Sequence, residues 1–354
     1  MTRNDSAKIR LKNQLLVDKT FNEAKDIVQW MCAMQAQDFP MSMWAVGIRH
    51  KNTTLDAVQK AFNSGEILRT HVLRPTWHLV SPDDISWMLE LTAPNIKNLT
   101  RARDYGLGID ETIINYCNSI LEKELRDGNH LTAEELKFVF KNLKIDTDEN
   151  RFYHIMMHAE LDGIVCSGAI KNKKQSYALL SERITTVPKL TRDEALAKLA
   201  FKYISSHGPV CLKDFAWWSG LSVGDSRKAI EMVKQHFVTE VIENETYWFF
   251  ETTIPNRSDS IHFIPAFDET IISYRNRNAV LMPEHQPKAY TSNGIFKPVV
   301  MINGEGSGIW KRTIKKDSVH IEIDHFINHN LPNIAFEKAI EKYGTFLGLK
   351  AIIK

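Results

Sequence analysis

The sequence lacks the features that mark several large protein classes. It contains no run of roughly 18 apolar residues, so no segment is predicted to span a membrane. Its four cysteines are far apart and form no CxxC pair, which favours a cytosolic protein with buried, reduced thiols. The P-loop and HExxH signatures are missing, so the common sites for nucleotide binding and zinc proteolysis are not predicted.

The chain also lacks an excess of charge of either sign. Its 45 Lys and Arg residues nearly balance its 43 Asp and Glu residues, and the formal net charge is +2. A nucleic-acid partner must therefore meet a local basic face rather than an overall positive field. The first ten residues, MTRNDSAKIR, are polar, so we expect no signal peptide and a cytoplasmic location.

What the chain does have is a repeated order of elements. Helical patterns followed by two strand-like runs occur three times at roughly 80-residue spacing, which predicts tandem winged helices. The second hairpin turns at Lys171–Lys174, which is basic, and the third at Glu243–Glu245, which is acidic. After residue 254 strand-like runs dominate, including 270–275 and 279–282, and an amphipathic helix at 335–348 ends the pattern.

We therefore predict an α+β protein with three tandem winged-helix domains and a C-terminal antiparallel β-barrel-like domain. The predicted domain ranges are 1–105, 106–188, 189–253 and 254–354. Within the first range, Ser81 and Pro82 predict a helix start, and Pro94 is expected to end that helix or to begin another.

Two glutamines, Gln35 and Gln37, follow an apolar helical run at 22–34. Because a proline disfavours a helical residue before it, Pro40 predicts that the helix ends at or before Phe39 and that both amides lie near its C-terminus. Primary amides supply hydrogen-bond donors and acceptors without charge, which suits a binding or catalytic site. Composition alone favours the alternative that both glutamines are solvated surface residues. Asp38 is the nearest carboxylate; helix capping or pairing is its simplest role, and electrostatic support is the alternative.

Basic and aromatic residues cluster in three places. Each cluster can be an ordinary solvated face, but together, on winged helices, they predict a surface that follows DNA phosphates. The predicted DNA-binding residues are Lys171, Lys173, Lys174, Tyr274, Arg275, Arg277, Trp310, Lys311 and Arg312. His154 and His158 are four apart on one helix, but a third ligand is missing, so no metal site is predicted.

Four stretches resemble one known family. Met34–Pro40 followed by Trp44–Gly47 is similar to the N-terminal motif of the AlkZ-like winged-helix DNA glycosylases. The runs HVLRPTWHLV (71–80), FDE (267–269) and GIW (308–310) match as well, so the resemblance covers nearly the whole chain. It implies an enzyme that excises N-alkylated purines, including those in interstrand crosslinks, with Gln35 and Gln37 as the catalytic pair.

The expected chemistry suits two neutral amides. Alkylation at guanine N7 makes the base cationic, so the base can leave without a general acid, and the enzyme needs only to hold a water against the anomeric carbon. We expect a monofunctional glycosylase that acts on double-stranded DNA carrying alkylated or crosslinked purines, as a monomer, with no cofactor and no metal. The alternatives are a non-catalytic winged-helix DNA-binding protein or regulator and a module that sequesters a toxin.

Overall fold

The computed structural model describes residues 2–185, 189–254, 260–327 and 332–354. The fold is a mixture of α-helices and small β-sheets, as predicted. Among the described residues, no helix is both long and apolar enough to cross a membrane.

Residue contacts divide the chain into two compact units. The first contains Met1–Val58, Leu196–Trp218 and Ser222–Lys354, and the second contains Gln59–Ala195 and Ser219–Leu221. The four consecutive domain ranges named above remain a prediction.

The N-terminal part of the first unit is mainly helical. It contains α1 (Arg3–Asn13), α2 (Ala24–Met31), the short strand β1 (Ala33–Gln35) and α3 (Phe39–Arg49). Thr2 begins α1 with a capping box, because its side chain accepts from the Asp5 N–H and the Asp5 carboxylate accepts from the Thr2 N–H.

A second group of elements in this unit combines helices with a hairpin. Its elements are α10 (Arg192–His207), β7 (Val210–Cys211), α11 (Leu212–Ser219), α12 (Val223–Val233), the 3₁₀ turn η1 (Lys234–His236), β8 (Val238–Ile242) and β9 (Glu245–Phe249). Strands β7, β9 and β8 form an antiparallel sheet in that order. The predicted turn is confirmed, since Glu243 and Asn244 have positive φ angles of 49° and 62° between β8 and β9.

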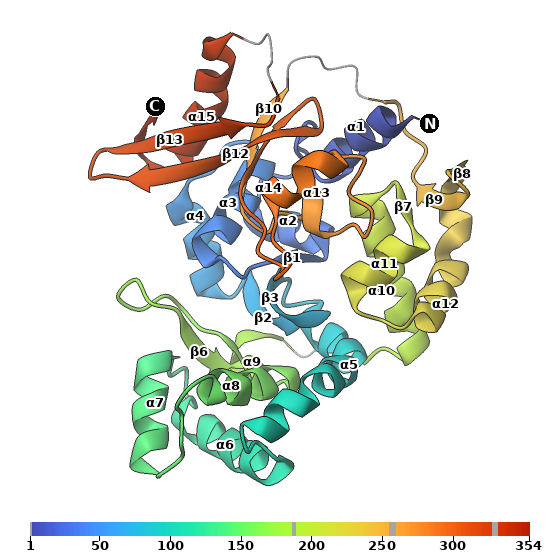
Figure 1. Ribbon diagram of the computed structural model, residues 1–354. Helices are drawn as coiled ribbons and strands as arrows, with labels where there is room; N and C mark the ends of the chain where they lie inside the picture. The colour runs from blue at the N-terminus through green and yellow to red at the C-terminus, as the bar shows by residue number, and fades with distance from the viewer. Residues whose placement is uncertain (1, 186–188, 255–259, 328–331) are drawn as a thin grey trace. The chain divides into compact units, whose positions relative to one another are not determined.

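The C-terminal part of the first unit is a curled five-stranded sheet. Its strands, in spatial order, are β10 (Ile261–Ile264), β11 (Val299–Ile302), β12 (Glu305–Ile314), β13 (Ser318–His325) and β14 (Lys350–Ile353). The first three pairings are antiparallel, but β13 and β14 are parallel, so the prediction of a wholly antiparallel sheet was wrong. The reason is α15 (Asn333–Leu347), which carries the chain back so that β14 runs in the direction of β13. Figure 1 shows α15 in red beside the long β12–β13 hairpin.

Two runs predicted to be strands have other conformations. Residues 270–272 belong to the short helix α13 (Glu269–Ile272) and 273–275 are irregular, while 279–282 form a turn before η2 (Pro283–His285) and α14 (Gln286–Ala289). Asp268 caps α13 by accepting from the Thr270 N–H at 2.9 Å. A capped helix start therefore outweighed the β-propensity of the isoleucines that follow.

An aromatic core joins α3, α15 and the sheet. The Trp44 ring lies 4.9 Å from the Tyr343 ring and 5.1 Å from the Phe346 ring, and Tyr343 lies 5.3 Å from Trp310. The indole N–H groups of Trp44 and Trp310 donate to the backbone oxygens of adjacent residues on β10, both at 2.8 Å. The terminal helix thus packs against the sheet.

The second unit contains two further hairpins and their helices. It includes most of α4 (Leu55–Ser64), β2 (Leu68–Val72), β3 (Arg74–Val80), α5 (Ile85–Gly106), α6 (Glu111–Glu124), β4 (Leu131–Thr132), α7 (Ala133–Asn142), α8 (Arg151–Leu161), β5 (Val165–Ser167), β6 (Ser176–Leu179) and α9 (Leu180–Arg183). Helix α5 is continuous through Pro94 to Gly106, so the expected break at that proline was wrong. Buried side chains on both sides, such as Leu91 and Ile96, hold the helix together.

Candidate active site

The two glutamines lie on β1 and on the loop that leads into α3. Helix α2 ends at Met31, Cys32 reverses the chain with a φ of 67°, and Ala33–Gln35 is extended. The prediction of a helix C-terminus was therefore wrong. Pro40 lies in the first turn of α3, where its missing N–H costs nothing, so it marks a helix start rather than a helix end.

Gln35 and Gln37 have different environments. Gln35 is buried, with 6% of its surface exposed, whereas Gln37 is exposed. The next residue, Asp38, is the N-cap of α3 and accepts from the Met41 N–H at 3.1 Å. Asp38 thus has the capping role, and Gln37 is the side chain of the pair that solvent or a substrate can reach.

A buried carboxylate lies against the backbone of Gln35. Glu269 Oε1 accepts from the Gln35 N–H at 2.6 Å, although the two residues are 234 positions apart. Glu269 Oε2 accepts from the indole N–H of Trp218 at 3.1 Å and from the hydroxyl of Ser273. Glu269, Trp218 and Ser273 are each at most 1% exposed. Both carboxylate oxygens are therefore held by neutral donors inside the first unit.

A histidine completes the surroundings of this carboxylate. His207 Nε2 lies 3.7 Å from Glu269 Oε2, and His207 is fully buried. Burial lowers the pKa of His207, although the nearby Glu269 carboxylate acts in the opposite direction. Burial thus disfavours the protonated form of this imidazole.

A second buried network lies directly beside the first. Arg49, at the end of α3, donates to both carboxylate oxygens of Asp268 at 2.8 Å, in the bidentate geometry that favours this pairing. The same guanidinium donates to Gln14 Oε1 at 3.0 Å, and the Gln14 amide donates to the Tyr274 hydroxyl at 2.8 Å. The Tyr274 hydroxyl donates to the His207 backbone oxygen at 2.8 Å. This chain of contacts ties α1, α3 and α13 together around the glutamine stretch.

Comparison with known proteins identifies the family. The family model described as "DNA glycosylase AlkZ-like" matches residues 28–346. The chain belongs to the AlkZ-like DNA glycosylase family. It is accordingly a DNA glycosylase, an enzyme that hydrolyses N-glycosyl bonds.

Two relatives support the assignment. The interstrand DNA cross-link repair glycosylase of Streptomyces sahachiroi is 22% identical over 327 residues, which cover 85% of each chain. The solved structure of Streptomyces sahachiroi DNA glycosylase AlkZ matches with a TM-score of 0.80 at 20% identity and covers 100% of both chains. The structural match shows that this AlkZ-like glycosylase has the fold of that enzyme.

Several residues predicted to contact DNA are structural in this AlkZ-like glycosylase. Tyr274 is fully buried beneath Arg10, whose guanidinium lies 3.7 Å from the ring centre. Arg277 is 7% exposed, and its Nε donates to the Ile271 backbone oxygen at 3.1 Å. Trp310 is 1% exposed and belongs to the aromatic core. These three side chains have little or no exposed surface, so their placement favours a structural role over the predicted contact with DNA.

The other predicted DNA contacts keep part of their surface. Arg275 and Lys311 are exposed, whereas the half-buried Arg312 donates to the Tyr343 hydroxyl. In the second unit, the turn of the β5–β6 hairpin carries three lysines, as predicted. Lys171 pairs with Glu135 at 3.2 Å, and Lys174, which is exposed, pairs with Glu134; Lys173 is also exposed at the tip. Arg275, Lys311, Arg312, Lys171, Lys173 and Lys174 remain predicted DNA contacts.

The stretch 71–80 of the family resemblance forms a tightly held hairpin in the second unit. His71 on β2 contacts Glu160 of α8 through both its N–H, at 2.9 Å, and its ring Nδ1. The Trp77 indole N–H donates to the same carboxylate at 3.4 Å, and the guanidinium of Arg69 lies 4.2 Å above the Trp77 ring. Burial lowers the pKa of Arg69 to about 10. Nothing in the sequence pattern pointed to Glu160 as the residue that fixes this hairpin.

The two histidines weighed as metal ligands share one acid. His154 Nδ1 and His158 Nε2 lie 2.6 Å and 3.0 Å from the two oxygens of Asp104. The described residues contain no group of three His, Cys, Asp or Glu side chains arranged to hold a metal ion. These histidines therefore connect α8 to α5.

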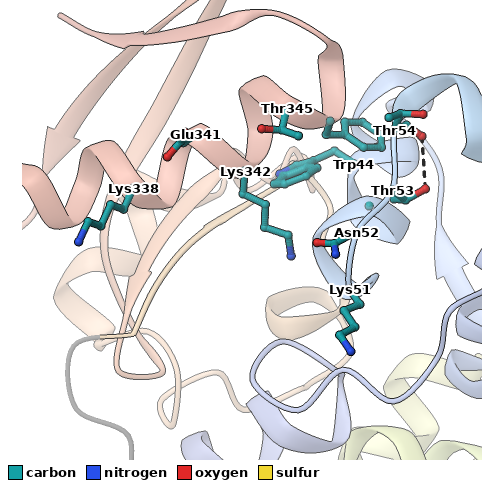
Figure 2. A pocket seen from close by; sticks show the side chains of 11 residues that line it. Trp44, Lys51, Asn52, Thr53, Thr54, Lys338, Glu341, Lys342 and Thr345 are labelled. Carbon is teal, nitrogen blue, oxygen red and sulfur yellow. Dashed lines mark hydrogen bonds between the residues drawn. The ribbon is translucent and has the colours of Figure 1, made fainter.

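A basic pocket of about 460 Å³ lies beside the C-terminal half of α3. Its walls come from α3, from the loop before α4 and from α15, and Figure 2 shows Lys51 and Lys342 on facing elements. Lys342 also donates to the Ile48 backbone oxygen at 2.7 Å. The lining contains three lysines, the third being Lys338, and a single acid, Glu341, so the pocket favours an anion.

Proposed function

We propose that this AlkZ-like glycosylase excises cationic N-alkylated purines of the N7-alkylguanine type, with Gln37 holding the attacking water. The observation that carries the proposal is the contrast between the two amides. Gln37 is exposed at the start of α3, and the backbone of Gln35, two residues earlier, is fixed by a buried carboxylate. An accessible amide on a fixed backbone can position a water molecule.

The chemistry follows from the charge of the substrate. Alkylation at N7 places a positive charge on the purine, so the electron pair of the N9–C1′ bond neutralises the ring as the base leaves. The water oxygen bonds to C1′ as oxocarbenium character develops, and its proton passes to solvent. The Gln37 carbonyl accepts from the water and orients it, while its NH₂ can donate to a sugar or phosphate oxygen. Because an amide is too weak a base to deprotonate water, an unmodified purine should not react.

We further propose that the substrate is double-stranded DNA and that it includes crosslinked purines. The named function of the Streptomyces sahachiroi relative, interstrand cross-link repair, supports this substrate class. We propose that the three groups of helices and hairpins are winged helices and that the exposed Arg275, Lys311 and Lys173 contact backbone phosphates. The protein is expected to act as a monomer. Membership of an enzyme family sets aside the regulator and the toxin-sequestering module as alternatives.

The test is release of a base from defined DNA. Duplex DNA with one N7-methylguanine is incubated with the protein, and abasic sites are cleaved with alkali. We expect strand breaks with the wild-type chain and a loss of about 100-fold in rate for Gln37→Ala, because water positioning is lost. Unmodified duplex is the substrate control. Absence of breaks above a no-enzyme control contradicts the proposed substrate, and an unchanged rate for Gln37→Ala contradicts the role of that residue.

A further inference from the structure

Glu269 has a placement that packing alone does not require. It is the first residue of α13, and its side chain crosses to β1, where Oε1 accepts from the Gln35 N–H at 2.6 Å. A buried carboxylate carries a large desolvation cost, which well-placed donors must offset. Here the donors include the backbone of the residue that begins the Gln35–Gln37 stretch.

The geometry of the contact explains why a carboxylate is present. Oε1 accepts from the Gln35 N–H, and Oε2 accepts from Trp218 and Ser273. Both oxygens of the Glu269 side chain are therefore needed as acceptors. A glutamine offers one carbonyl oxygen and one NH₂ group. In either orientation its NH₂ would face a donor, and a buried N–H would lose its partner.

We infer that Glu269 is a positioning residue for the catalytic pair, an inference that rests on the proposed role of Gln37. Its charge-assisted hydrogen bond fixes the backbone at Gln35, and Asp38 fixes the chain again at the start of α3. Only Ala36 and Gln37 lie between these two anchors. The exposed amide of Gln37 therefore projects from a segment of two residues that is held at both ends.

The two anchors differ in what they support. The cap at Asp38 is local to α3, and any good capping residue can replace it. The Glu269 contact joins two segments that are 234 residues apart and cannot be replaced by a neighbour. Loss of the Glu269 contact should therefore displace Gln37 relative to the bound base, and displacements of this kind lower rate rather than affinity.

The first experiment compares two variants of the same buried cluster. In Glu269→Gln one acceptor is lost, whereas Ser273→Ala removes a donor to Oε2 and leaves the Gln35 contact in place. Single-turnover rates are measured at saturating enzyme on duplex DNA with N7-methylguanine, together with DNA affinity and Tm. We expect Glu269→Gln to be ~10- to ~100-fold slower with unchanged affinity. Ser273→Ala should lower Tm but slow the reaction less than about threefold.

The second experiment separates positioning from a general loss of structure. If Glu269 acts through Gln37, then Glu269→Gln should slow the Gln37→Ala variant far less than it slows the wild type, because that amide is already gone. Equal slowing in both backgrounds would overturn the inference. So would a wild-type rate in Glu269→Gln while Gln37→Ala is slow. If Gln37→Ala itself reacts at the wild-type rate, the proposed function has failed, which is a distinguishable result.

Discussion

The buried pair Arg49–Asp268 permits a quantitative prediction about stability. Both side chains are fully buried, and the guanidinium makes two 2.8 Å hydrogen bonds to the carboxylate. Asp268→Asn keeps the size of the side chain, and its one remaining oxygen can still cap α13. What it removes is the negative charge, which leaves the Arg49 cation buried without its counter-ion.

Breaking a buried pair by removing one partner costs about 3–5 kcal/mol. A chain of this length loses roughly 2 °C or more of Tm per kcal/mol, so the first unit should melt at least ~6 °C earlier. The measurement is a calorimetric scan of both proteins at pH 7.5. Because the chain has two compact units, the shift should appear in one transition if the units melt separately.

The control removes both charges. Arg49→Met/Asp268→Asn leaves no unpaired cation at this position, and replacement of a buried pair by neutral groups is often close to neutral in stability. We expect the double variant to recover more than half of the lost Tm. If Asp268→Asn costs less than about 1 kcal/mol, or if the double variant is the less stable of the two, the pair does not stabilise the first unit in this way.

Three further changes give distinct outcomes. Gly47→Ala places a Cβ 2.6 Å from Cε2 of the buried Phe346 ring, so overpacking should cost about 1–3 kcal/mol in urea unfolding. Burial lowers the pKa of His207, so the unfolded chain binds more protons than the folded chain below about pH 6.5. The free energy of unfolding therefore decreases as the pH is lowered, and His207→Gln should reduce this decrease between pH 7.5 and 5.5 in urea unfolding. If a DNA phosphate enters the basic pocket, Lys51→Ala/Lys338→Ala should make the slope of log affinity against log salt less negative by ~0.9 per phosphate, and an unchanged slope excludes this contact. The matched controls are Gly106→Ala and Lys25→Ala/Lys350→Ala.

Local signals in the sequence predicted most helices and hairpins. Turn residues and alternating β-branched residues act over a few positions, and the structure follows them at the turn between β5 and β6 and at the turn between β8 and β9. The errors arose where one local signal has two meanings. Pro40 predicts a helix end because proline cannot continue a helix, but proline is equally suited to the first turn of the next helix. Pro94 is tolerated inside α5, whose packing holds the helix on both sides.

The candidate site could be predicted only in part, for a related reason. Gln35, Gln37 and Asp38 lie within four consecutive positions, so one motif contains them, and Asp38 is the nearest carboxylate along the chain. In the structure the Asp38 carboxylate caps α3, and a different carboxylate, that of Glu269, accepts from the Gln35 N–H. Each acid accepts from a backbone N–H group that needs a partner, because N–H groups at a helix start and on a buried strand both require an acceptor. The hydrophobic periodicity of a sequence does not identify which distant acid contacts a buried strand. A carboxylate that lies next to a candidate motif in the sequence is therefore best tested first as a helix N-cap. A carboxylate that supports the site electrostatically is better sought among the buried acids of the folded protein.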